Sequence, residues 1–247
     1  MAASLEVKGL TLRFGGVTAL DGVDLSVGAG EVVGLIGPNG SGKTSLFNVL
    51  TGNFKAEGSV LLDGRDLPGR PEQIAKSGVS RTFQNLQFAS RLSVFENIRA
   101  ARHARAHWRE TVWQTRTSQR AEREDLLGIL GLLGLAEKAW DMPESLTLVE
   151  FRHLEIARVI AADASLVLLD EPAAGMTPAE TDRITATIAA HLLPNRSAIV
   201  IEHKMGLIGA LCSRVAVLDA GRKIADGPLA DVLNTREVRR SYFGEVA

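Results

Sequence analysis

The amino-acid sequence predicts an α/β protein with a mainly parallel sheet, an antiparallel β subdomain and a helical subdomain. Three patterns support this expectation. Residues 5–27 alternate apolar and polar side chains, which is typical of antiparallel strands with one solvated face. The composition of residues 92–136 favours helices, and this stretch carries many charges. Beyond residue 160, nearly continuous apolar runs alternate with helical stretches, as in a parallel sheet covered on both faces.

The first third of the chain combines strands with one helix. Strands are expected over residues 5–8, 10–14, 17–27, 31–36 and 59–62. Turn signals lie at Asp21-Gly22 and at Gly28-Ala29-Gly30. A helix is expected over residues 45–50, directly after a glycine-rich loop.

The last third supplies the remaining parallel strands. They are expected over residues 166–169, 198–201 and 215–218, with helices between them, the first over 178–191. The tail from Pro228 predicts one or two short helices. We treat residues 1–247 as a single domain, with a core over about 1–91 and 160–247 and a helical subdomain over about 92–159.

Composition excludes several classes of protein. At 247 residues the chain can bury a core without disulfides or metals, and its net charge of −1 gives no bulk reason to bind nucleic acid. The single cysteine, Cys212, lies among apolar residues and is expected to be a buried thiol in a reduced, cytosolic setting. No signal peptide is expected at the N-terminus. The longest apolar stretch, residues 126–135, is shorter than the roughly 18 residues that span a bilayer, so we do not expect the chain to cross a membrane.

The most specific motif is the loop Gly37-Pro38-Asn39-Gly40-Ser41-Gly42-Lys43-Thr44, which matches G-x-x-x-x-G-K-[ST] between a predicted strand and a predicted helix. Glycines allow successive backbone amides to point at an anion, and the helix dipole adds to the attraction. Lys43 is expected to reach the β- and γ-phosphates of ATP, and the Thr44 hydroxyl to ligate Mg²⁺. The alternative, a plain strand-to-helix turn, does not account for the agreement of strand, loop and helix.

Two acids follow a buried strand in the second half of the chain. Asp170 and Glu171 come directly after Leu166-Val167-Leu168-Leu169, at the edge where open α/β sheets bind ligands. Asp170 suits the coordination sphere of Mg²⁺, and Glu171 is placed to polarise an attacking water. By itself, Asp-Glu-Pro is also a common helix-start signal.

These motifs, in this order, resemble the ATP-binding subunits of ABC transporters over nearly the whole chain, and the resemblance implies a P-loop NTPase core. It identifies Phe14 as the aromatic residue that stacks on adenine, although an aromatic core residue is the alternative. Gln84 matches the glutamine that offers its amide oxygen to Mg²⁺ or water and senses the membrane subunit. Glu171 matches the catalytic glutamate, and His203 the histidine that bonds the γ-phosphate.

The chain departs from the family pattern at the signature, where Leu-Ser-Gly-Gly-Gln is usual. Here the segment is Leu146-Thr147-Leu148-Val149-Glu150, which the resemblance places against the ATP of a partner subunit. Thr147 keeps a hydroxyl, but Val149 puts a branched side chain where bare backbone should approach phosphate, and Glu150 adds a negative charge. We therefore expect a poor catalytic lid, unless only the backbone N–H of Val149 is used.

Several segments are similar to those of branched-chain amino-acid importers. They are Arg13-Phe14-Gly15-Gly16, Arg81-Thr82-Phe83-Gln84, residues 154–158, residues 173–178 and residues 241–245. The resemblance implies an importer of hydrophobic amino acids or related solutes, with a second ATP-binding subunit (the same chain or another), transmembrane permease subunits and, indirectly, a periplasmic or extracellular solute-binding protein. It also implies a peripheral position on the cytoplasmic face of the inner or cell membrane.

Three other functions are compatible with parts of this sequence. They are a soluble ABC-type ATPase, a small-molecule kinase with a phosphate loop, and a non-hydrolysing regulator gated by ATP. The chain has one phosphate loop and no heptad run, which argues against the first. A kinase would not explain Gln84, Glu171 and His203 together, whereas the altered signature keeps the third alternative plausible.

Overall fold

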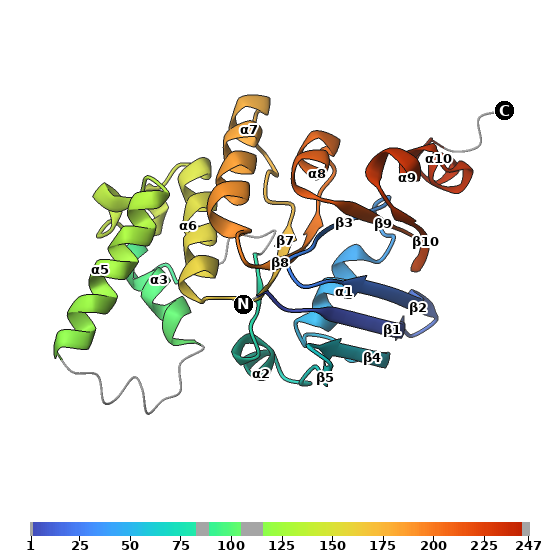
Figure 1. Ribbon diagram of the computed structural model, residues 1–247, viewed down its shortest axis with the longest axis horizontal. Coiled ribbons are helices and arrows are strands. Elements are labelled where there is room, and N and C mark those ends of the chain that lie inside the picture. Colours follow the sequence, from blue (N-terminus) through green and yellow to red (C-terminus); the bar gives the residue numbers. More distant parts are fainter. Residues whose placement is uncertain (1, 83–88, 105–115, 244–247) are drawn as a thin grey trace.

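Two sheets form the centre of the protein in the computed structural model, which describes residues 2–82, 89–104 and 116–243 (Figure 1). The smaller sheet has the strand order β2-β1-β4-β5, and the larger has the order β10-β9-β3-β8-β7-β6. The first contains β1 (Leu5–Phe14), β2 (Val17–Val27), β4 (Glu57–Leu62) and β5 (Arg65–Asp66). The second contains β3 (Val32–Ile36), β6 (Val79–Arg81), β7 (Leu166–Asp170), β8 (Ser197–Ile201), β9 (Arg214–Asp219) and β10 (Arg222–Gly227).

The smaller sheet is antiparallel, as the alternating pattern predicts. The turn predicted at Asp21-Gly22 is wrong, because β2 continues through both residues. Pairing jumps from Leu10↔Val23 to Leu12↔Leu20, so these residues form a β-bulge. Gly22 has a φ of +64°, which a bulge accommodates as readily as a turn.

The larger sheet is parallel from β6 to β9, and only β10 pairs in the antiparallel direction. β3 lies between β8 and β9 although it precedes them by more than 150 residues in the sequence. The sequence patterns predicted β3, β7, β8 and β9. They missed β6, which has three residues, and β10, which is only half-buried.

Helices surround the larger sheet and extend away from one of its edges (Figure 1). They are α1 (Lys43–Leu50), α2 (Pro71–Lys76), α3 (Val94–His103), α5 (Arg116–Leu132), α6 (Leu148–Ala161), α7 (Pro178–Thr187), α8 (Met205–Leu211), α9 (Leu229–Asn234) and α10 (Arg236–Phe243). A π-helical segment, Ile188–Leu192, continues α7, so the helix predicted over 178–191 is present with a change of winding. None of the helices in the described ranges has the length and hydropathy needed to span a bilayer.

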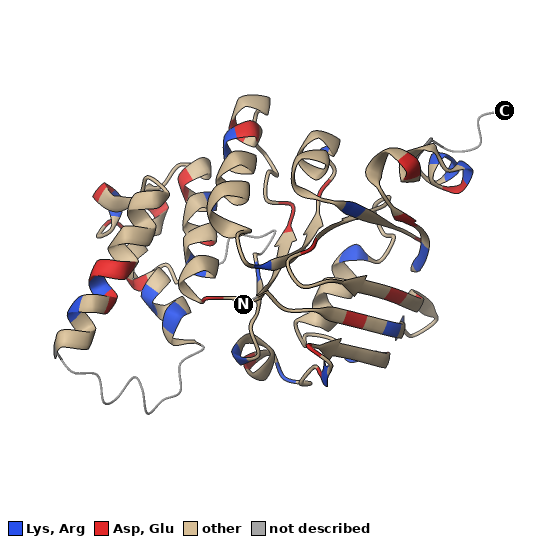
Figure 2. Ribbon diagram, viewed as in Figure 1, with Lys and Arg blue, Asp and Glu red and all other residues tan. Residues whose placement is uncertain are grey.

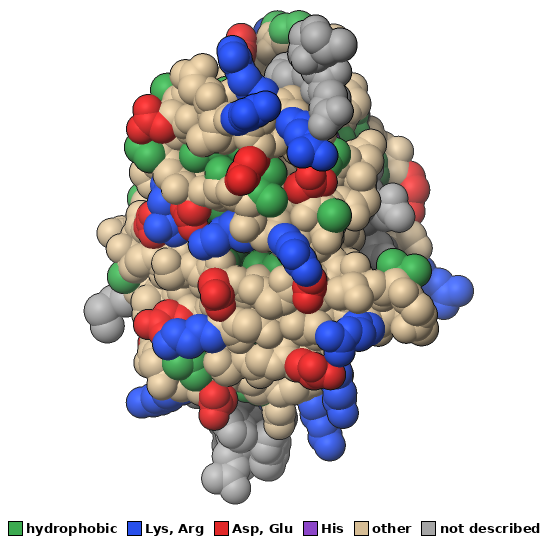
Figure 3. Space-filling model, turned by 90° about the vertical axis from the view of Figure 1, so that its right-hand side faces the viewer, with side chains coloured by type: hydrophobic (Ala, Val, Ile, Leu, Met, Phe, Trp, Pro, Cys, Tyr) green, Lys and Arg blue, Asp and Glu red, His purple; other side chains and the backbone are tan. Residues whose placement is uncertain are grey.

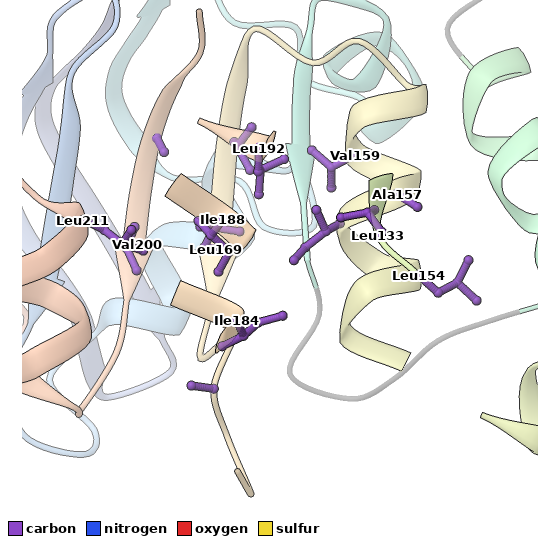
Figure 4. Packing of buried hydrophobic residues seen from close by; sticks show 14 of the residues in the cluster. Leu133, Leu154, Ala157, Val159, Leu169, Ile184, Ile188, Leu192, Val200 and Leu211 are labelled. Atoms are coloured by element: carbon purple, nitrogen blue, oxygen red, sulfur yellow. The ribbon is translucent and has the colours of Figure 1, made fainter. Parts of the chain in front are cut away.

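The larger sheet separates two hydrophobic cores. Along β7, Leu166 and Leu168 face the core shared with α1 and the smaller sheet, whereas Val167 and Leu169 face the core beneath α6 and α7. The other inner strands alternate in the same way, since successive strand residues point to opposite faces. Figure 4 shows the second core, which includes Leu169, Val200, Ile184 and Ile188. Both faces of the sheet are therefore covered, as the apolar strands predict.

The helical segment between residues 94 and 161 stands beside the sheet in Figure 1. Its helices α3, α5 and α6 share buried side chains such as Ile98, Leu130 and Leu154. Charges of both signs lie on α3 and α5 (Figure 2), and Figure 3 shows the same mixture on another face of the molecule. The subdomain boundaries near residues 91 and 159 stay a prediction.

Candidate active site

The glycine-rich loop joins the end of β3 to the start of α1. Gly37, Gly40 and Gly42 have φ values of +148°, +79° and +106°, a region that side chains disfavour. A Cβ added at Gly37 would lie 2.0 Å from the carbonyl oxygen of Leu218, so any other residue there would displace β9. Gly42 is the N-cap of α1 and provides no side-chain cap. The loop thus ends at an uncapped helix start, which favours an anion.

Lys43 folds back over this loop. Its Nζ donates hydrogen bonds to the carbonyl oxygens of Gly37 and Pro38, both at 2.8 Å, and the residue is only 6% exposed. Burial lowers the pKa of the Lys43 ammonium, and the charges of Glu171 and Asp170 oppose that shift. The ammonium therefore lies inside the loop and interacts with the negative charges of both acids. A terminal phosphate bound in the loop would contact it there.

Asp170 is held by a residue to which the sequence patterns assigned no function. Arg81, at the end of β6, places its Nη2 2.6 Å from Asp170 Oδ2, and the two side chains are 7% and 2% exposed. The other terminal nitrogen, Nη1, donates to Asn48 Oδ1 at 2.7 Å, and the guanidinium lies over the Phe47 ring. Arg81 therefore links the acid at the end of β7 to the helix that follows the phosphate loop.

Glu171 adopts an unusual backbone conformation directly after β7. Its φ is +49°, which is uncommon for a residue with a side chain, and its N–H donates to the carbonyl oxygen of Ile201 at 2.9 Å. Its Oε1 lies 3.4 Å from His203 Nε2, and the side chains are 22% and 43% exposed. The structure therefore brings together the two residues predicted to act on the attacking water and on the γ-phosphate.

The predicted adenine-stacking residue lies on the surface. Phe14 ends β1 and is 46% exposed, so it is not an aromatic core residue. Its ring meets that of Phe54 edge to face, with centroids 5.0 Å apart and planes at 76°. This contact fixes the orientation of Phe14 and leaves ring surface in solvent. Gln84, which was also assigned through the resemblance, lies outside the described residues.

The signature segment forms the start of α6. Thr147 is the N-cap, its hydroxyl accepts from the Glu150 N–H, and the Glu150 carboxylate accepts from the Thr147 N–H at 2.8 Å. Glu150 also lies 2.7 Å from the ammonium of Lys138, which together with the Thr147 N–H lowers the pKa of this carboxyl to about 2. The expected extra charge at this helix start is therefore paired with a lysine. The capping pattern Thr-x-x-Glu could have predicted the bonds between Glu150 and Thr147, but not the pairing with Lys138.

The remaining signature side chains lie close to the turn that follows β7. A Cβ added at Gly175 would lie 3.5 Å from Leu148 Cδ2, and Leu148 itself is 39% exposed. Val149 is half-buried and packs against the core beneath α6. The exposed Leu148 therefore lies next to Gly175, four residues after Glu171.

The oxygen donors at the site fit a metal that is held mainly through phosphate and water. In the described ranges, no group of three or more His, Cys, Asp and Glu residues could enclose a metal ion. The exposed Thr44 hydroxyl and the Asp170 carboxylate are hard oxygen ligands of the kind that Mg²⁺ takes singly or in pairs. Because Arg81 engages Asp170 Oδ2, the second oxygen of this carboxylate is the one that fits a direct or water-mediated contact.

Comparisons with known proteins agree with this geometry. A family model described as ABC transporter matches residues 20–174. The chain is 38% identical over 249 residues to the high-affinity branched-chain amino acid transport ATP-binding protein BraF of Pseudomonas aeruginosa, with 98% of each chain covered. It is also 38% identical over 251 residues to the high-affinity branched-chain amino acid transport ATP-binding protein LivG of Escherichia coli, with 98% of each chain covered.

Solved structures lead to the same family. An ATP-binding cassette of an ABC transporter in its ADP conformation superimposes with a TM-score of 0.83 at 28% identity, over 99% of this chain and all of that one. A nucleotide-free cassette also gives 0.83, at 27% identity. These comparisons agree with the phosphate loop, the buried acid and the glutamate–histidine pair at the carboxyl ends of the parallel strands. The chain therefore belongs to the ABC transporter family and is one of its ATP-hydrolysing subunits.

Proposed function

We propose that this chain is the ATP-binding subunit of an importer of branched-chain or other hydrophobic amino acids, and that it couples ATP binding and hydrolysis to uptake. The observation that carries the ATPase assignment is that the Lys43 ammonium interacts with the charges of Glu171 and Asp170, while Glu171 lies 3.4 Å from His203. The solute class is carried over from the relatives, whose names specify branched-chain amino acids.

In the proposed mechanism, the phosphates of ATP lie in the loop from Gly37 to Thr44, and Lys43 exchanges its bonds to the loop carbonyls for bonds to phosphate oxygens. Mg²⁺, held by Thr44 and Asp170, would supply charge neutralisation at the β- and γ-phosphates. Glu171 orients the attacking water and accepts its proton, while His203 bonds the γ-phosphate. Phe14 offers its exposed ring to adenine.

A second ATP-binding subunit completes the site in this proposal. The segment from Leu146 to Glu150 would face the γ-phosphate bound by the partner subunit. The Lys138–Glu150 pair reduces the repulsion between Glu150 and that phosphate, which leaves Val149 as the main obstacle to close approach. Val149→Gly is then expected to raise ATPase activity at the partner's loop, and an unchanged rate would mean that only the backbone N–H matters.

The permease is proposed to dock where the core meets the helical subdomain. A cavity of about 290 Å³ opens there between α2, β6, α3 and α6, and its lining includes Ile74, Arg81, Glu155 and Arg158. Apolar walls with charges of both signs suit a short helix from a membrane subunit. The chain would accordingly be bound peripherally at the cytoplasmic face of the inner or cell membrane, and Gln84, two residues after Thr82 of the cavity lining, would sense the contact.

The decisive experiment is purification of the complex from membranes, with ATPase activity measured with and without a binding protein loaded with a branched-chain amino acid. We expect stimulation by the loaded binding protein and loss of most activity in Glu171→Gln, with ATP binding retained. Glu144→Gln, an exposed glutamate on the turn before the signature, serves as the matched control. ATPase activity independent of any membrane complex would favour the soluble ATPase, and ATP binding without turnover the regulator.

A further inference from the structure

The residues on either side of His203 bind the segment that follows Glu171. β7 and β8 are neighbouring parallel strands, with Asp170 paired to Ile201, so the segments that follow them leave the sheet side by side at the carboxyl ends of the strands. Glu171 begins the segment that leaves β7, here called the first exit. Glu202, His203 and Lys204 form the segment that leaves β8, the second exit. The two exits are therefore adjacent, although they are about 30 residues apart in sequence.

Glu202 fixes the backbone of the second exit and joins it to the first. The residue is 3% exposed. Its Oε2 accepts hydrogen bonds from the backbone N–H groups of His203 and Lys204 at 2.6 and 3.1 Å. Its Oε1 accepts from the Ala173 N–H at 3.2 Å. One buried carboxylate thus orients the peptide that carries His203 and holds the residue two positions after Glu171.

Lys204 also binds the first exit. Its Nζ donates to the carbonyl oxygens of Ala173 and Met176, both at 2.9 Å, and to the Thr181 hydroxyl at 2.7 Å. A lysine ammonium has three donors, and here all three have acceptors within one short segment, residues 173–181. The ammonium therefore closes the loop between β7 and α7 onto the chain that carries His203.

The backbone of Glu171 requires such support. A glutamate with a φ of +49° is strained, and strained conformations persist only where the surrounding contacts determine them. The bonds from Glu202 and Lys204 to Ala173 begin two residues after this position. They restrict the same turn that sets the direction of the Glu171 side chain.

We propose that Glu202 and Lys204 are positioning residues, which hold the Glu171 turn and the His203 peptide as one unit and thereby set the distance between the two side chains. The inference rests on the catalytic roles proposed for Glu171 and His203. Neither Glu202 nor Lys204 needs to touch ATP for this role. A loosened unit would retain its phosphate loop and bind ATP, but it would align the water and the γ-phosphate poorly.

The test compares Lys204→Met, which keeps the length of the side chain and removes its donors, with Lys223→Met as a matched control. Lys223 lies on β10 and pairs with Asp226 at 2.8 Å, so the control removes a half-buried lysine of another element. In the complete transporter, we expect Lys204→Met to lower kcat about tenfold or more, because small misplacements of catalytic groups are costly. KM for ATP should stay within about twofold of the wild type, since the loop that binds the phosphates is untouched. Lys204→Arg, which keeps charge and donors, should recover part of the loss.

A second measurement does not depend on turnover. Hydrogen exchange of the nucleotide-free full chain should become faster at the amides of residues 173–176 in Lys204→Met and stay unchanged there in Lys223→Met. If Lys204→Met does not fold, Thr181→Val removes one acceptor at nearly constant volume and should act in the same direction, more weakly.

Unchanged kcat and unchanged exchange in Lys204→Met would overturn the proposal, as would an equal loss in both lysine variants. Failure of the proposed catalytic function has a different result, namely full activity in Glu171→Gln. The two failures are therefore distinguishable.

Discussion

Replacement of Arg81 by methionine tests the buried ion pair beneath the nucleotide site. The guanidinium is 2.6 Å from the Asp170 carboxylate, and both side chains are less than a tenth exposed, so solvent screens the pair little. Arg81→Met removes the ion-pair partner of this buried carboxylate. Removal of one partner of a buried pair costs about 3–5 kcal/mol. For a chain of 247 residues this corresponds to a melting temperature lower by about 6–20 °C.

The assay is thermal unfolding of the nucleotide-free chain in a double-mutant cycle with Asp170→Asn. Because the double variant has no buried charge at this position, we expect it to be more stable than the Arg81→Met single variant. Arg120→Met, which removes an ion pair with Glu124 whose side chains are 83% and 66% exposed, is the control and should change stability little. If the costs of Arg81→Met and Asp170→Asn add within about 0.5 kcal/mol, the two residues are not coupled and the reasoning is refuted.

Three further predictions concern single side chains. Phe14→Ala should weaken ATP binding by about 1–3 kcal/mol, the value of a base on an aromatic ring, while Phe14→Trp keeps the affinity; equal binding by all three proteins would exclude stacking. The pKa of Glu150 is lowered from 4.5 to about 2 by Lys138, so its ionised form stabilises the fold above pH 4.5 and loses this effect as the pH falls toward 2. The stability difference between wild type and Glu150→Gln should shrink across that interval, and a constant difference would contradict the pairing. Burial raises the pKa of the Cys212 thiol to about 12, so a thiol reagent at pH near 8 should label it slowly in the folded chain and quickly in denaturant; rapid labelling of the folded chain would contradict this.

Local sequence was sufficient for the elements that support the site. The alternation in residues 5–27 predicted antiparallel strands, and the apolar runs predicted four of the inner strands, because side-chain periodicity depends only on neighbouring residues. It was insufficient at Asp21-Gly22, where the residues of a turn form a bulge instead. A glycine with positive φ serves both, and the partner strand decides between them.

The candidate site shows the same limit. The phosphate loop, Asp170 and Glu171 could be predicted, since each follows an apolar strand in a recognisable local pattern. Arg81 and Lys204 could not, because their partners are 89 and from 23 to 31 residues away in sequence. A lone basic residue has no local signature, and its function here depends on which acceptors the strand order brings to it.

The sequence by itself determined the phosphate loop, the acids at the end of β7 and the membership of a family, because glycine spacing and strand periodicity are properties of short segments. The tertiary structure alone decided that β3 lies between β8 and β9, that Arg81 pairs with Asp170, and that Glu202 and Lys204 hold the turn of Glu171. These contacts join segments that are distant in the chain, and only the packing of parallel strands around one sheet edge makes them neighbours.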